Sequence, residues 1–73
     1  MYNQKLRHMT TKVSLIIHSH LNDMEIELTS NPEMASKRLK LIRRLLVECP
    51  DTTVGISDER LEELWNGLNL GEF

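Results

Sequence analysis

Cysteine is nearly absent from this chain of 73 residues, which contains Cys49 alone. A single cysteine cannot form an intramolecular disulfide, and it excludes zinc sites built from four cysteines or from two cysteines and two histidines. Without such cross-links, a chain of this size depends on its hydrophobic core, which contributes roughly a few kcal/mol of net stability. We therefore expect one small domain that works in a reducing compartment.

Long hydrophobic runs are also missing. The longest, Leu15-Ile16-Ile17 and Leu45-Leu46-Val47, are far shorter than the roughly 20 apolar residues that span a bilayer. The basic residues near the N-terminus are followed by no sustained apolar stretch and no small-residue cleavage site, so no signal peptide is apparent. We expect a soluble, cytoplasmic protein with no membrane partner.

The motifs of common enzymes are absent. The sequence has no Gly-x-Ser-x-Gly elbow, no Cys-x-x-Cys pair and no glycine-rich phosphate loop. A chain this short can hardly enclose a substrate cleft. We expect no catalytic residue, no cofactor and no enzymatic activity.

The histidines raise the question of a metal site. His18 and His20, with His8 and Cys49, are the available nitrogen and sulfur ligands. On a helix, residues two apart are rotated by about 200°, so His18 and His20 share a metal only if this segment is a strand. We expect instead a surface His18, a partly buried His20, and a Cys49 that acts as a small apolar residue at a helix end.

Apolar periodicity predicts a first helix over residues 11–29, after a mobile arm at residues 1–10. Thr10 or Thr11 is a candidate cap. A strand over residues 12–18 is the alternative, since Val13, Leu15 and Ile17 alternate and two of these three are β-branched.

Two further helices are bounded by clearer signals. Asn31 before Pro32 favours a helix start, and Pro50 ends the pattern, which predicts a helix over residues 31–48. Residues 50–56 read as a loop with Val54 and Ile56 as anchors. Ser57 and the acids after it predict a third helix over residues 57–68, followed by a short tail.

The fold class is therefore all-α, a compact three-helix domain over residues 11–73 with a mobile N-terminal arm and a C-terminal tail. Its predicted core consists of Ile16, Ile17, Leu21, Met24, Leu28, Ile42, Leu45, Leu46, Leu61, Leu64 and Trp65.

Charge is segregated although the net charge is only −2. Five basic residues fall within residues 37–44, and seven acids against one arginine fall within residues 45–73. Projected at 100° per residue, the second helix has a basic face, Lys37, Lys40, Arg43 and Arg44, opposite its apolar arc. The third helix begins with an acidic cluster, Asp58, Glu59, Glu62 and Glu63. Arg38 falls inside the apolar arc, where we expect it to extend to solvent or pair with an acid.

Both charged surfaces are candidate binding sites, although charge on the outer side of an amphipathic helix is ordinary. A protein partner fits the mixed charges better than a nucleic acid, for which a basic excess over the whole domain is typical. The loop of about seven residues is also longer than the turn of a helix-turn-helix. We favour the acidic cluster as the partner-binding surface, with Trp65 or Phe73 as an anchor. A nucleic-acid binder that uses residues 37–44 is the alternative, and a metal-dependent enzyme is a distant third hypothesis.

In length and general make-up, this cysteine-poor helical chain with segregated charge resembles the small phage-encoded regulators of host RNA polymerase, of the type found in lytic Xanthomonas phages. The resemblance rests on no diagnostic motif, so it transfers no residue. It implies a protein that binds bacterial RNA polymerase, at the N-terminal region of the β′ subunit, disturbs σ-factor function, inhibits initiation and promotes antitermination.

Overall fold

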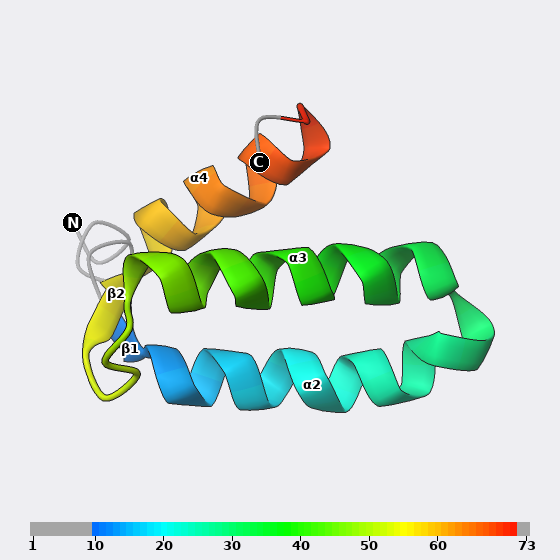
Figure 1. The fold of residues 1–73 in the computed structure, drawn as a ribbon, viewed down its shortest axis with the longest axis horizontal. Helices are drawn as coiled ribbons and strands as arrows, with labels where there is room; N and C mark the ends of the chain where they lie inside the picture. The colour runs from blue at the N-terminus through cyan, green and yellow to red at the C-terminus, as the bar shows by residue number, and fades with distance from the viewer. Residues whose placement is uncertain (1–9, 72–73) are drawn as a thin grey trace, which may run out of the picture.

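The computed structural model describes residues 10–71 and shows three helices and one two-stranded sheet (Figure 1). The elements are β1 (Thr10–Lys12), α2 (Val13–Ser30), α3 (Pro32–Glu48), β2 (Gly55–Ser57) and α4 (Asp58–Asn69). Helices α2 and α3 form an antiparallel hairpin, and α4 crosses α3 at an angle on one face of this hairpin, where Trp65 of α4 also contacts His20 of α2 (Figure 1). The predicted three-helix class is confirmed.

The start of α2 differs from the sequence prediction because a small sheet precedes it. Strands β1 and β2 are antiparallel, with Thr11 opposite Ile56 and Lys12 opposite Gly55. Residues 11 and 12 are thus extended rather than helical. The alternative strand over residues 12–18 is wrong beyond Lys12, because Val13, Leu15 and Ile17, whose alternation favoured it, lie within α2. Residues 1–9 of the predicted mobile arm lie outside the described residues, whereas Thr10 belongs to β1.

The predicted threonine cap of this helix is wrong. The N-cap residue is Lys12, whose side chain makes no capping hydrogen bond. Instead, the backbone N–H groups of Val13 and Ser14 donate to the carbonyls of Val54 and Thr52, both at 2.9 Å. The loop therefore supplies acceptors that a cap would otherwise provide, and the predicted loop at residues 50–56 also contributes Gly55 and Ile56 to β2.

The other helix boundaries follow their predicted signals. Asn31 caps α3, its side-chain oxygen accepting from the Met34 N–H at 3.3 Å, and Pro32 takes the first helical position. Ser57 caps α4 by accepting from the Arg60 N–H at 3.2 Å. Cys49 is the C-cap of α3 and is partly buried against the core, as expected for a small apolar residue at a helix end.

The core is centred where α2, α3, β2 and α4 meet. Its buried cluster comprises Val13, Ile16, Leu41, Leu45, Ile56 and Leu64. The predicted core is right for Ile16, Ile42, Leu45 and Leu64, while Ile17, Met24, Leu61 and Trp65 are partly buried. It is wrong for Leu21, Leu28 and Leu46, which are exposed. These three lie on a side of the hairpin that no described element covers.

Arg38 confirms the expectation that it pairs with an acid from another element. Its Nε donates to Glu27 Oε1 at 2.5 Å, and its Nη1 lies 3.4 Å from Asp23 Oδ2. Both acids come from α2, so this ion pair joins the two helices of the hairpin at a position where the apolar arc of α3 carries a charge.

Candidate partner-binding surfaces

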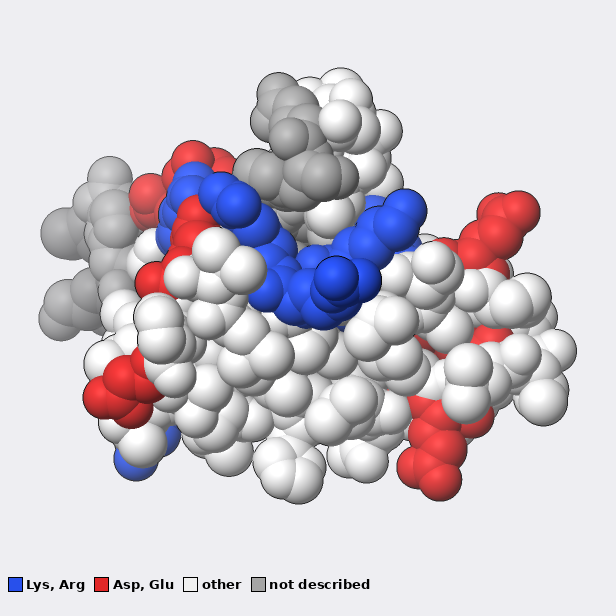
Figure 2. All heavy atoms as spheres, viewed as in Figure 1, with Lys and Arg blue, Asp and Glu red and all other residues white. Residues whose placement is uncertain are grey.

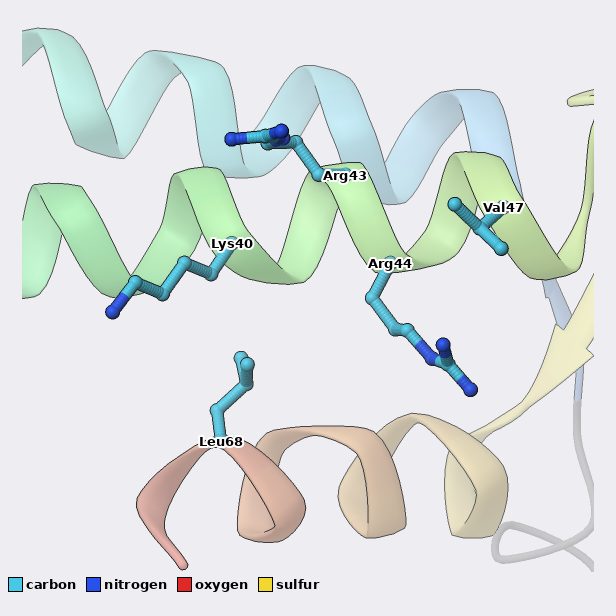
Figure 3. A pocket seen from close by; sticks show the side chains of 5 residues that line it. All are labelled: Lys40, Arg43, Arg44, Val47 and Leu68. Carbon is cyan, nitrogen blue, oxygen red and sulfur yellow. The ribbon is translucent and has the colours of Figure 1, made fainter. Parts of the chain in front are cut away.

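A hollow beside the basic face lies between α3 and α4 (Figure 3). It has a volume of about 310 Å³ and is lined by Lys40, Arg43, Arg44, Val47 and Leu68. In Figure 3, Leu68 points from α4 toward α3, while Lys40 and Arg44 extend from α3 into the space between the helices. We call this site the basic groove.

Helical spacing explains why these residues meet. Lys40, Arg44 and Val47 follow one another at intervals of four and three, so they lie along one side of α3. Leu68 follows the buried Leu64 by one turn and continues the apolar stripe of α4 beyond the core. The groove therefore combines apolar surface from Val47 and Leu68 with three cationic side chains.

The four cations of the basic face differ in their contacts within the protein. Lys37 lies over the Trp65 ring, with Nζ 4.0 Å from the ring centroid, and donates to Asn69 Oδ1. Arg44 Nη2 lies 3.4 Å from Glu48 Oε1. Lys40 and Arg43 are exposed, and within residues 10–71 neither forms an ion pair. These two cations are thus the ones most available to an acidic partner. Figure 2 shows basic side chains as a band over α3, on the side where α4 lies.

All four residues of the acidic cluster are exposed. Asp58 and Glu59 occupy the first turn of α4, where a negative charge is favourable beside the helix dipole. Glu63 Oε2 lies 3.3 Å from Arg60 Nη1, and Arg60 also pairs with Glu48. Part of this cluster is therefore neutralised within the protein.

The acidic cluster borders a second hollow, of about 320 Å³, on the other flank of α4. Its lining comprises His20, Leu41, Asp58, Leu61, Glu62 and Trp65. The structure thus separates the two predicted charged surfaces: the basic groove lies between α3 and α4, and Asp58 and Glu62 lie beside the hollow that includes His20 of α2.

His20 and Trp65 link α2 to α4. Their rings are stacked, with centroids 6.1 Å apart and an interplanar angle of 22°. His20 Nδ1 lies 2.9 Å from Arg38 Nη1, and because a guanidinium group can only donate, this nitrogen accepts. Burial, and then the charge of Arg38, lower the pKa of His20 from its usual 6.5.

The predicted positions of the histidines are confirmed: His18 is exposed and His20 is partly buried. Within residues 10–71, no three or more His, Cys, Asp or Glu side chains are grouped so that they could hold a metal ion. None of the helices in that part of the chain has the length and apolar character needed to cross a membrane.

No family model, no curated protein and no solved structure matches this chain. Its function therefore has to be inferred from its own surfaces. Sequence periodicity identified the basic face and the acidic cluster but not the basic groove, because Val47 and Leu68 join it only through the packing of α4 on α3. The signal that could have identified it is Leu68, an apolar residue one turn past the core of α4.

Proposed function

We propose that this protein is a small binding module that takes an acidic segment with an apolar anchor from a protein partner into the basic groove. The observation that carries the proposal is the groove itself, in which the exposed Lys40 and Arg43 flank apolar surface from Val47 and Leu68. Apolar contact contributes affinity, and flanking charge contributes orientation and association rate.

We thus favour the basic face as the binding surface, in place of the acidic cluster that the sequence favoured. The acidic cluster offers charge, but Glu63 is paired with Arg60. The hollow beside it contains His20 and Trp65, whose ring contact joins α2 to α4. Because these two rings are already in contact with each other, we favour the basic groove, where Lys40 and Arg43 form no ion pair within residues 10–71.

For the partner, we propose bacterial RNA polymerase, engaged in the cytoplasm of a phage host so that transcription is inhibited at initiation and redirected toward antitermination. The resemblance in length and charge distribution to phage regulators supports this choice. An acidic surface near the N-terminal region of the β′ subunit would be the complement of the basic groove. Under this proposal the chain acts by occupying a surface and performs no catalysis.

A binding assay on immobilised RNA polymerase without DNA tests the proposal. We expect the double variant Lys40→Glu/Arg43→Glu to lose about tenfold or more in affinity, as for charges at a desolvated contact. The matched variant Glu59→Lys/Glu62→Lys changes the same number of exposed charges on α4 and should retain binding. Circular dichroism must first show that both variants are folded.

The reverse pattern, with loss confined to the variant of the acidic cluster, would show that the acidic cluster is the binding surface. A different outcome would favour the nucleic-acid alternative: DNA binding whose affinity falls steeply with salt, together with no retention on polymerase. The acids Glu48 and Glu63, which lie within the same network as Arg44 and Arg60, oppose that alternative.

A further inference from the structure

The side of the α2–α3 hairpin opposite α4 is an exposed apolar surface. Helix α4 contacts α2 at His20 and α3 at Lys37. Residues on the other flank of each helix are left uncovered by the described chain. We call this surface the hairpin face, and its exposed members are Leu21 (46% exposed), Leu28 (63%), Leu39 (44%) and Leu46 (45%).

Helical spacing shows that these leucines form one strip. Leu21 and Leu28 are seven residues apart on α2, and Leu39 and Leu46 are seven apart on α3, so each pair lies on one side of its helix. Ile17 and Met24 lie beside the first pair, and the buried Ala35 and Ile42 lie beside the second. Lys37 and Arg44, on the α4 side, are rotated by about 160° from Leu39 and Leu46, respectively.

The hairpin face carries charge only at its edges. Figure 2 shows a broad surface over α2 and α3 with little blue or red. By helical position, the edge on α2 carries Glu25 and the edge on α3 carries Lys40 and Arg43. A contiguous apolar strip on so small a protein is typical of an interaction surface.

We propose that a second copy of this chain covers the hairpin face and forms a symmetric four-helix bundle, in which α2 of each copy packs against α3 of the other. The charge at the edges supports this occupant. One edge is acidic and the other is basic, so the surface is complementary to itself when the two hairpins face each other about a twofold axis parallel to the helices.

The positions along the hairpin agree with this pairing. Glu25 lies five residues before the end of α2, and Lys40 lies eight residues after the start of α3. At 1.5 Å per residue their offset along the hairpin is about 5 Å, which is within the reach of a lysine side chain. The other twofold arrangement, α2 on α2 and α3 on α3, would instead bring Lys40 and Arg43 near their own copies, which is unfavourable.

Sedimentation equilibrium of the full chain tests the proposal between about 1 µM and 1 mM, the range of weak to moderate dimers. The average mass should rise from 8.5 kDa toward twice that value. Leu39→Glu should weaken dimerisation at least tenfold. Ile26→Glu is the matched control, because Ile26 is 70% exposed and lies on the outer side of α2, away from the hairpin face.

A charge exchange gives a second readout that does not depend on the leucines. Glu25→Lys and Lys40→Glu should each weaken the dimer, and the double variant should restore it, which no effect on monomer folding would reproduce. A wild-type protein that stays monomeric over the whole concentration range overturns the proposal. So does an Ile26→Glu variant that is impaired as strongly as Leu39→Glu, or a double variant that is no better than the single ones.

Discussion

His20 lies where the three helices meet, so the protonation of its ring affects contacts with all of them. Its Nδ1 accepts from Arg38, which is itself paired with Glu27, and its ring stacks on Trp65. A proton on Nδ1 would face a guanidinium group that can only donate. Burial and the charge of Arg38 therefore lower the pKa of His20, and they outweigh the opposite influence of Asp23 and Glu27.

This pKa shift predicts how stability depends on pH. Because the pKa of His20 is lower in the folded state than its usual 6.5, the unfolded chain takes up the proton first as the pH falls. The contribution of a neutral His20 to stability is therefore complete above pH 6.5 and declines as the pH drops below that value.

Thermal unfolding at about pH 7.5 and about pH 5 measures the effect, with His20→Gln as the control, since glutamine can still accept from Arg38 and does not titrate. The wild type should lose more of its melting temperature on acidification than the variant. Equal losses in both proteins would contradict the assignment of this pH dependence to His20.

Trp65 predicts a second effect at the scale of one residue. It is partly buried, contacts His20, and lies beneath the Lys37 ammonium at 4.0 Å. Trp65→Ala removes both contacts and part of the apolar packing, so it should lower the free energy of unfolding by about 2 kcal/mol. This is less than the roughly 3–5 kcal/mol of fully buried aromatic side chains, because the ring is only partly buried. Urea unfolding measures this, and Trp65→Phe should recover part of the loss. A change under about 0.5 kcal/mol, the range of ordinary surface substitutions, would show that Trp65 does not hold α4 to the hairpin.

At the scale of the elements, each helix start is stabilised in a different way. Asn31 and Ser57 cap α3 and α4 with their side chains, whereas the start of α2 depends on carbonyls of the loop that leads to β2. A side-chain cap can be read from neighbouring letters of a sequence. Acceptors that come from a loop some forty residues away, Thr52 and Val54 against Val13 and Ser14, cannot.

The cap of α4 supports a prediction. Ser57→Ala removes the acceptor for the Arg60 N–H and should lower the free energy of unfolding by about 1 kcal/mol. Ser36→Ala is the control, because Ser36 is exposed within α3 and alanine is the better helix former there. Chemical denaturation of both variants checks the prediction, and equal stabilities would contradict it.

The difference between local signals and contacts with distant parts of the chain explains how much of the fold could be predicted. Periodicity, proline and capping residues sufficed for α3 and α4 and for the class of fold. They did not predict the sheet, because a pair of strands of three residues each has too little periodicity to be recognised. The same signals placed Leu21, Leu28 and Leu46 in the core, although these residues are exposed. Periodicity shows which side of a helix is apolar, but it does not show which part of that side a third helix covers.

The candidate site was predictable to a similar degree. The basic face follows from the spacing of Lys37, Lys40 and Arg44, and Arg38 was correctly expected to pair with an acid. The basic groove was not predictable, because Leu68 reaches it only through the angle at which α4 packs on α3.

At the scale of the whole molecule, the hairpin with α4 on one flank leaves two surfaces for binding. The basic groove lies between α3 and α4, and the hairpin face lies on the flank that α4 does not cover. Lys40 and Arg43 line the groove and also lie at the edge of the hairpin face. The apolar residues of the two surfaces are different, Val47 and Leu68 in the groove and four leucines on the hairpin face, so a dimer and a bound partner can coexist on one chain.

This separation predicts that each surface can be disabled alone. Leu21→Glu places a charge on the hairpin face, on the helix that does not line the basic groove, and should abolish dimerisation while polymerase binding is retained. Val47→Glu places a charge in the lining of the groove at a side chain that is 69% exposed, and should weaken polymerase binding about tenfold or more through repulsion of an acidic segment, with the fold intact. Sedimentation equilibrium and retention on immobilised polymerase, measured on both variants, give four results. Loss of polymerase binding in Leu21→Glu would mean that the partner, rather than a second copy, covers the hairpin face. If Val47→Glu retains full binding, the basic groove is not the site of contact.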